Sequence, residues 1–518
     1  GMPAALRVAC PTQVGGMVPR WGGPPHSKDR NGDHPMLNYL TGQPLEIGPG
    51  PHLFLDDHLI EDRRQLTRRV NPPYRHPGNP IIVADRPWEE RPYRPQVIRN
   101  PETGGWRMYY MCFSGTNYWS RKGPSYYACY AESMDGIRWE KPERADLPFD
   151  PWPATNVLHV DDERDARIQA PWVFFDPHDT DPAHAWKMIY NSAGLRLAYS
   201  PDGIHWTPAR PEPLFAYHSD TMNHVLWNER AGKWVLYMRP PMFSSGRPEG
   251  PGVEHHRRRT AVSFSDDLLH WSVPRTVLYP DELDPTPHID SVHVFPYAGH
   301  YIAFVTMLDA TTGGTNELML ASSRDGLRWE RPLPRQVWLS RGREGDFDGG
   351  CVSVGSDPIR VGWELWFPMS GFPMPQKVFE QESGIGIVKM MVDRFLSLEA
   401  PEPSLGGPED FGWLLTKEFI WRGKTLTINC RMNNGDSRTY GDLRVEVVKR
   451  PNDADPAGRM GQVVPGHGVE DCDLIRSNSP VQTVTWNGNP DLGFLDGQPV
   501  YLRFRIRNGG LFAFRMGE

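Results

Sequence analysis

The stretch Ser200-Pro-Asp-Gly-Ile-His-Trp206 is one of four copies of the same pattern. In each copy a serine is followed by an aspartate two residues later and by a tryptophan six residues later, and the other copies occupy residues 133–139, 265–271 and 323–329. Successive tryptophans, at positions 139, 206, 271 and 329, lie 67, 65 and 58 residues apart. A short motif that returns at a near-constant interval indicates a repeated supersecondary unit.

The motif has the chemistry of a connection between two strands. Asp-Gly favours a tight turn, and serine and aspartate side chains bond the local backbone. The tryptophan then packs the returning strand against its neighbours. We therefore expect the repeated aspartates to be structural, namely Asp135, Asp202, Asp266 and Asp325.

Strand-like runs precede each copy and complete a four-stranded unit. In the second unit they are residues 172–175, 186–190 and 195–199, and Trp206 lies in the fourth strand. A fifth unit, with an incomplete turn motif, follows the fourth. Five such units predict a five-bladed β-propeller over residues 51–400, with the run at 53–60 closing the ring.

The two ends of the chain differ in composition from this region. Residues 1–50 are rich in glycine and proline and lack periodicity, so we expect an irregular N-terminal arm. A proline- and glycine-rich segment at 399–408 marks a second boundary. Residues 401–518 alternate apolar and polar side chains in runs such as 443–447 and 500–506, which predicts a C-terminal β-sandwich. The whole chain is thus expected to be all-β.

Composition argues against several classes of partner. The formal net charge is -8, which disfavours nucleic acid. No run approaches about 20 apolar residues, so no membrane-spanning segment is expected. If Met2 is the native start, the protein is expected in the cytoplasm; if a leader was removed before Gly1, it is expected to be secreted. The sequence does not indicate an oligomeric state.

The six cysteines contain no CxxC pair, so neither a zinc site nor a disulfide framework is expected. Cys112 and Cys129 lie in strand-like runs and are predicted to be small buried residues. No metal or cofactor is predicted. A metal in the channel could be bound by His293 or a carboxylate, but these residues do not show the spacing of a metal site.

Candidate catalytic residues come from the geometry of a propeller. The first strand of each blade lines the central channel, and the segments leading into these strands open on the face opposite the Asp-Gly turns. Three of these segments carry an aspartate at matching positions, namely Asp220, Asp290 and Asp348, and Glu317 begins the third strand of the fourth unit. Clustered carboxylates repel one another and are costly without a use. The alternative is that each aspartate caps the turn before its strand.

Other residues on the same face are candidates for substrate binding, because aromatic rings stack on sugars and polar side chains bind hydroxyl groups. They are Tyr93, Arg94, Trp119, Gln169, Asn223 and His255. For the aromatic residues the alternative is packing between blades. Carboxylates and aromatic rings at a channel mouth suit cleavage of a glycosidic bond, in which one carboxyl protonates the leaving oxygen and the other attacks the sugar or activates water.

The repeats and the length of five units resemble the five-bladed propeller glycosidases, a group that includes glycoside hydrolase families 32, 43 and 68 and related bacterial glycosidases. The resemblance covers roughly residues 50–400, and the sandwich behind it is similar to that of family 32. It implies this fold, a glycan substrate and catalytic acids at the channel mouth. The Trp-Met-Asn-Asp-Pro, Arg-Asp-Pro and Glu-Cys motifs of family 32 are absent, so the resemblance assigns no individual catalytic role.

Three functions follow from these patterns. The first is a glycoside hydrolase that uses Asp220, Asp290, Glu317 and Asp348. The second is a glycoside phosphorylase, in which His255 and Arg257 hold the phosphate that replaces water. The third is a non-catalytic carbohydrate-binding propeller, which agrees with the absence of an acid before the first inner strand, at residues 93–96.

Overall fold

The computed structural model describes residues 39–100, 102–161, 168–217, 219–240, 257–401, 411–433, 440–450 and 461–517. These ranges consist mainly of strands and connecting turns, as the sequence predicts. The helical elements are short: α2 (Gly115–Ser120), η1 (Pro182–His184), η3 (Ala310–Thr312) and η4 (Gly493–Leu495). No helix in the described ranges is long and apolar enough to cross a membrane.

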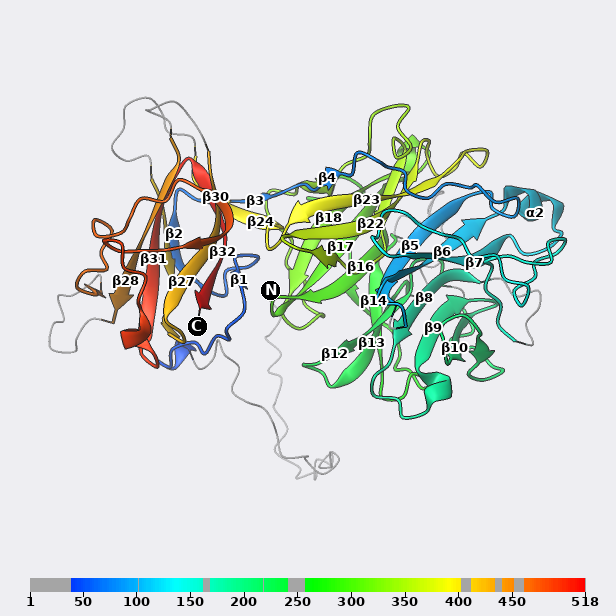
Figure 1. Ribbon diagram of the computed structural model, residues 1–518, viewed down its shortest axis with the longest axis horizontal. Coiled ribbons are helices and arrows are strands. Elements are labelled where there is room, and N and C mark those ends of the chain that lie inside the picture. The colour runs from blue at the N-terminus through cyan, green and yellow to red at the C-terminus, as the bar shows by residue number, and fades with distance from the viewer. Residues whose placement is uncertain are drawn as a thin grey trace, which may run out of the picture.

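Three groups of antiparallel strands follow one another along the chain (Figure 1). The first group contains β5 (Pro92–Arg99), β6 (Trp106–Phe113) and β7 (Tyr126–Ser133). The second contains β8 (Gln169–Phe175), β9 (Trp186–Asn191), β10 (Leu195–Ser200) and β11 (Thr207–Pro208). The third contains β12 (His224–Asn228), β13 (Lys233–Met238), β14 (Thr260–Ser265) and β15 (Arg275–Leu278).

A fourth and a fifth group share one nine-stranded sheet, joined by a parallel bridge between Asn316 and Cys351. The fourth group contains β16 (Ile289–Tyr297), β17 (His300–Asp309), β18 (Thr315–Ser323) and β19 (Val337–Leu339). The fifth contains β20 (Cys351–Val354), β21 (Ile359–Val361), β22 (Glu364–Phe372) and β23 (Gly384–Met391), with β4 (Tyr74–Arg75) on its outer edge.

The strand that completes the fifth group comes from the N-terminal side of the chain, but not from the run predicted to do so. In β4, Arg75 pairs with Val388 and Tyr74 with Lys389 of β23. Residues 53–60 belong elsewhere, because β1 (His52–Leu53) pairs with β32 and β2 (Ile60–Arg64) pairs with β25. The prediction that 53–60 closes the ring is therefore wrong.

Two further six-stranded sheets hold the C-terminal strands. One contains β1, β3 (Thr67–Val70), β24 (Leu396–Glu399), β27 (Thr425–Met432), β30 (Asn478–Thr483) and β32 (Gly509–Gly517). The other contains β2, β25 (Gly412–Thr416), β26 (Phe419–Ile420), β28 (Asp442–Lys449), β29 (Gln462–Val463) and β31 (Pro499–Arg507). Alternate residues of β31 are buried, and Leu502 and Phe504 share one core with Ile428 and Phe514 of the other sheet.

The two C-terminal sheets draw strands from both sides of the predicted boundary near residue 400. Figure 1 shows β3 and β24 running between them and the strand groups. These strands were expected in the propeller, yet β24 pairs with both β3 and β32. Leu45, from the predicted irregular arm, is 1% exposed and lies in the same C-terminal core. These pairings join segments that are far apart in the chain, so the local sequence does not predict them.

A separate hydrophobic cluster lies between each group and the next, and another joins the fifth group to the first. Each cluster contains large side chains from both groups that it joins, because the apolar face of a sheet must be buried against another element. In chain order, representative pairs are Tyr130 and Met188, Ile189 and Leu236, Tyr237 and Val294, Phe304 and Phe367, and Ile387 and Met108. The five groups are thus packed in a closed cycle.

The four motif copies form the same hydrogen bonds. In the second copy, Ser200 Oγ accepts from the Gly203 N–H at 2.8 Å, and Asp202 Oδ1 accepts from the N–H groups of Ile204 and His205 at 2.8 and 2.9 Å. Equivalent bonds occur in the first, third and fourth copies. The prediction that these turns are structural is confirmed.

In the third copy the structural aspartate is Asp267, which corrects the expectation of Asp266. Asp267 Oδ1 accepts from the Leu269 and His270 N–H groups, whereas Asp266 is exposed and pairs with Lys233. Leu268 holds the left-handed position, at φ 65°, that glycine occupies in the other copies. Burial of the Leu268 side chain, which is 1% exposed, offsets the steric cost of this conformation.

Candidate functional site

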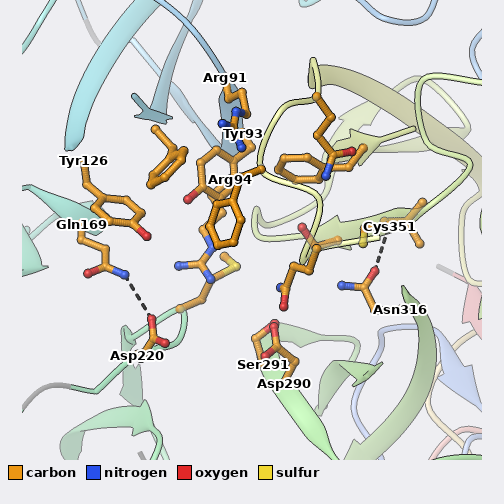
Figure 2. Close-up of a pocket in the computed structure, with 18 of the residues that line it drawn as sticks. Arg91, Tyr93, Arg94, Tyr126, Gln169, Asp220, Asp290, Ser291, Asn316 and Cys351 are labelled. Atoms are coloured by element: carbon orange, nitrogen blue, oxygen red, sulfur yellow. Dashed lines mark hydrogen bonds between the residues drawn. The ribbon is translucent and has the colours of Figure 1, made fainter. Parts of the chain in front are cut away.

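A cavity of about 280 Å³ opens where the first strands of the groups begin (Figure 2). Its walls come from all five groups. This agrees with the prediction that the segments leading into the first strands open on one common face. Five of the predicted site residues line it, namely Tyr93, Arg94, Gln169, Asp220 and Asp290. Arg258, from the basic run at residues 255–259, also lines it, and so do residues that the sequence did not suggest, among them Arg91, Phe113, Tyr126, Asn316 and Phe372.

Three of the first strands carry a β-bulge where they meet the cavity. The register shifts between Tyr93 and Gln96 in β5, between Gln169 and Trp172 in β8, and near the start of β16. In β5 and β8 the bulge includes a non-glycine residue with positive φ, and Arg94 is at 52°. Bulges of this kind occur next to active sites, where they redirect side chains. No residue pattern in the sequence predicts these bulges.

Asp290 is a buried carboxylate with two arginine partners. Its Oδ1 lies 3.2 Å from Nη2 of Arg239 and in closer contact with Nη1 of Arg258. Burial opposes ionisation of Asp290, but the positive charges of Arg258, Arg239 and Arg94 outweigh it and lower its pKa. At neutral pH this carboxyl is therefore ionised.

Asp220 precedes β12 and is half-buried at the opposite side of the cavity from Asn316 (Figure 2). Its Oδ1 accepts a hydrogen bond of 3.1 Å from Nε2 of Gln169. Gln169 is 3% exposed and begins β8, so the second group orients a carboxylate of the third. Asn223, also predicted to bind substrate, instead donates to the carbonyls of Ser219 and Thr221 and shapes the loop that carries Asp220.

The other two predicted acids do not line this cavity. Asp348 is 1% exposed, and its Oδ2 lies 2.7 Å from Nε of Arg75, so it holds the closing strand β4. Glu317 follows Asn316 in β18, and successive residues of a strand point to opposite faces. Asn316 lines the cavity and its Oδ1 accepts from the Val352 N–H at 2.7 Å, whereas Glu317 lies 3.9 Å from Nε of Arg341.

Trp119 lies in a helix rather than in the expected loop. Ser114 caps α2 by accepting from the Asn117 N–H, which allows the short helix to form. Trp119 is 66% exposed and lines an adjoining cavity of about 490 Å³ together with Phe379, Glu380 and Glu382. His255 lies outside the described residues.

Arg91 is the main feature of the cavity that the sequence did not predict, since Arg94 was among the predicted binding residues. Arg91 is 9% exposed, and its guanidinium lies 4.7 Å from the centre of the Phe113 ring. Arg258 belongs to a basic run, His255-His-Arg-Arg-Arg259, and that cluster was a usable signal. Arg91 has no comparable signal, because its neighbours Glu90 and Pro92 are unremarkable in a turn-rich segment.

One buried cluster has residue types that bind metals. Atoms of Glu89, Cys112 and Cys129 lie within 4.8 Å of one another. The Glu89 carboxylate, however, accepts from the Tyr110 hydroxyl at 2.6 Å and pairs with Lys141 at 2.6 Å. Burial raises the pKa of both thiols, which disfavours the thiolates that a metal needs. Both cysteines are fully buried, as predicted.

Comparisons with known proteins found similarity in structure alone. No family model matches the chain, and no curated protein matches it. One solved structure, described as a glycoside hydrolase, has 10% identity and a TM-score of 0.42, and the match covers 85% of this chain and 99% of that one. At these values similarity defines neither a substrate nor a reaction.

Two further solved structures have comparable values. An α-L-arabinofuranosidase from Podospora anserina in complex with cellotriose has 15% identity and a TM-score of 0.40, with coverage of 63% of this chain and 97% of that one. A structure described with the mannoside phosphorylases and hydrolases of family 130 has 15% identity and a TM-score of 0.38, with coverage of 62% and 94%. The chemistry must therefore be argued from the cavity.

Proposed function

We propose that the five strand groups are the blades of a five-bladed β-propeller and that the two C-terminal sheets form a β-sandwich. The closed cycle of hydrophobic clusters supports the ring, since each group packs on two neighbours and the fifth packs on the first. The strand β4 then completes the last blade from the N-terminal side. The common core of the two C-terminal sheets supports the sandwich.

We further propose that the protein is a glycoside hydrolase whose reaction takes place in the cavity at the mouth of this propeller. The observation that carries this proposal is the convergence of Asp220 and Asp290, from different groups, on one cavity. Aromatic rings of Tyr93, Tyr126 and Phe372 share its walls. Carboxylates and aromatic faces together suit a sugar ring, and the volume suits a monosaccharide-sized group.

The two carboxyl groups have different surroundings, which suggests different roles. Asp290 is kept ionised by its arginines, so it supplies negative charge beside an anomeric carbon that becomes positive in the transition state. Asp220 accepts a hydrogen bond from Gln169 and is the second carboxyl of the cavity, so we assign it the role of protonating the leaving oxygen. Glycoside cleavage uses one carboxyl as the acid and a second, ionised carboxylate.

The test is a screen of the purified chain against aryl glycosides and plant and microbial polysaccharides, followed by two variants. On a polysaccharide, whose leaving group needs a proton, Asp220→Asn and Asp290→Asn are each expected to lower the rate of sugar release by about 10²- to 10⁴-fold. Asp266→Asn is the matched control, because Asp266 is exposed at the far ends of the strands. Full activity in both variants would contradict the proposal, and glycan binding without cleavage would favour a non-catalytic binding protein.

A further inference from the structure

The cavity carries more positive than negative charge. Among the residues that the structure describes, Arg91, Arg94 and Arg258 line it against Asp220 and Asp290, with no lysine, histidine or glutamate. Three arginines and two aspartates leave one excess positive charge. Asp290 is shared between Arg258 and the buried Arg239, which lies behind it. Asp290 thus pairs directly with Arg258 and Arg239, and Arg91 and Arg94 form no direct ion pair with it.

Neither of these two guanidinium groups has an ion pair within the described residues. No carboxylate oxygen there lies within 4.0 Å of Arg91 or Arg94. Arg94 as a whole is half-buried, but its Nη1 is shielded from solvent and has no hydrogen-bond acceptor among the described residues. A donor that is shielded from solvent and lacks an acceptor is destabilising by itself. Such a cost is common where a ligand supplies the missing partner.

The backbone holds Arg94 in a conformation that is costly in the absence of a use. Its φ of 52° places it in the left-handed region, inside the β-bulge of β5. Its N–H donates to Ser370 Oγ of the fifth group at 2.7 Å, which fixes the bulge. A non-glycine residue in this region is strained, because its Cβ crowds the following carbonyl oxygen. The bulge directs the side chain into the cavity, beside Tyr93 and toward the two aspartates (Figure 2).

Arg91 is held in a different way. The Phe113 ring covers its guanidinium at 4.7 Å, and the residue is 9% exposed. Stacking on an aromatic face leaves the N–H groups at the edge of the guanidinium plane available for hydrogen bonds. Arg91 also borders the adjoining cavity, where Glu90 and Glu380 lie beyond ion-pair distance, although their charges partly offset the lowering of its pKa by burial. Arg91 can therefore donate to a ligand in the cavity.

We propose that Arg91 and Arg94 form a binding subsite for an oxyanion, so that the ligand of this cavity carries a carboxylate or a phosphate. This inference rests on the proposed glycoside-cleaving function and narrows its substrate class. Planar guanidinium groups bind both oxyanions through paired, charge-assisted hydrogen bonds. The anion has two chemical sources: the carboxylate of a uronic acid residue in the glycan, or inorganic phosphate as a co-substrate.

The two sources imply different reactions at the same carbon. With a uronic acid, water attacks the anomeric carbon, the glycosidic C–O bond breaks, the leaving oxygen takes the proton of Asp220, and the proton lost by the attacking water restores the acid form of Asp220. With inorganic phosphate, an oxygen of hydrogen phosphate attacks in place of water and the product is a glycosyl phosphate, while the leaving oxygen takes the proton of Asp220 and the proton of hydrogen phosphate replaces it. The subsite then either orients the substrate or holds the nucleophile.

Calorimetry on the full chain tests binding separately from catalysis. The probes are glucuronate, galacturonate and inorganic phosphate, with glucose and galactose as neutral counterparts. At least one anion is expected to bind ten or more times more tightly than the neutral sugars. Arg91→Gln and Arg94→Gln are each expected to weaken that binding by about tenfold to a hundredfold, since each removes charged hydrogen bonds. Arg99→Gln is the control, because Arg99 is exposed at the other end of β5.

Arg94→Lys and Arg91→Lys cover the case in which a glutamine variant does not fold. They keep the charge but lose the planar fork, so weaker anion binding with unchanged neutral-sugar binding is expected. Product analysis separates the sources: glycosyl phosphate formed in phosphate buffer identifies phosphate, and cleavage of uronides in phosphate-free buffer identifies the carboxylate. The proposal would be overturned if the neutral sugars bound as tightly as every anion. It would also be overturned if the variants at both Arg91 and Arg94 bound anions as tightly as the wild type.

These outcomes are distinguishable from failure of the hydrolase proposal. Anion binding that depends on Arg91 and Arg94, without cleavage of any glycan, supports the oxyanion subsite and contradicts the hydrolase. Cleavage of neutral glycosides that depends on Asp220 and Asp290, but is unaffected at the two arginines, supports the hydrolase and contradicts the subsite.

Discussion

The two ends of the strand groups follow opposite rules. At one end, four turns repeat the same serine and aspartate hydrogen bonds, and even the leucine of the third copy adopts the glycine conformation. At the other end, where the first strands begin, the groups contribute different residues: Arg94, Gln169, Asp220, Asp290 and Cys351. The repeated residues at the turns stabilise the fold, whereas the residues that differ between groups, at the starts of the first strands, are the ones that can form a functional site.

The largest expected difference in stability is between substitutions of two tryptophans, one at each end of the strand groups. Trp206, in the repeated turn, is fully buried in the cluster between the first and second groups. Trp206→Ala is expected to lower the free energy of unfolding by about 3–5 kcal/mol through lost burial and a cavity. Trp119→Ala, at the other end and 66% exposed, is expected to change it by less than about 0.5 kcal/mol. Urea unfolding measures both, and equal losses would break the comparison.

A smaller effect is expected for two adjacent aspartates of the third turn. Asp267→Ala removes an acceptor for two backbone N–H groups, so a loss of about 1–2 kcal/mol in the free energy of unfolding is expected. Asp266→Ala removes an exposed ion pair with Lys233 and is expected to cost less than about 0.5 kcal/mol. The same denaturation measurement compares them, and the reverse order would show that the turn is assigned to the wrong aspartate.

The smallest expected effect is a dependence on pH. Burial opposes ionisation of Asp267, but hydrogen bonds from His270 and Leu269 lower its pKa from 3.8 to about 2. Because the folded pKa lies below the unfolded one, the stabilisation is complete above about pH 4 and is lost as the pH falls toward 2. Asp267→Asn should therefore lose less stability than the wild type between pH 5 and 2.5. The difference is expected to stay below about 1 kcal/mol, because the side chain is exposed to solvent.

Asp266→Asn serves as the control for this pH series. It should follow the wild-type curve, because its neighbour Asp267 keeps the turn hydrogen bonds. An unchanged pH dependence in Asp267→Asn would mean that this carboxylate contributes nothing as an ionised group.

Local patterns in the sequence predict the groups, their order and the structural turns, because antiparallel neighbours and Asp-Gly turns depend on nearby residues. The same register places Asp220 and Asp290 at one cavity. Asp348 shares their position in the register, but its role is set by Arg75, which is 273 residues away. Long-range partners of this kind leave no trace in the local sequence.

Three other predictions failed for a similar physical reason. Glu317 was one residue out of phase with the cavity, and a strand reverses its face at every residue. The bulge at Arg94 depends on a hydrogen bond to Ser370 in another group. The closing strand β4 has two residues, too few to show periodicity. Each miss thus concerns a contact between distant segments or a shift of one residue.

The most direct test of the central claim is the dependence of the Asp220→Asn variant on the leaving group. If Asp220 protonates the leaving oxygen at the cavity, the variant should be close to wild type on a 2,4-dinitrophenyl glycoside, whose leaving group needs no proton. On a glycoside with an alcohol leaving group it should be slower by about 10²- to 10⁴-fold. An equal loss on both substrates, or no loss on either, would contradict the assignment of the chemistry to this face.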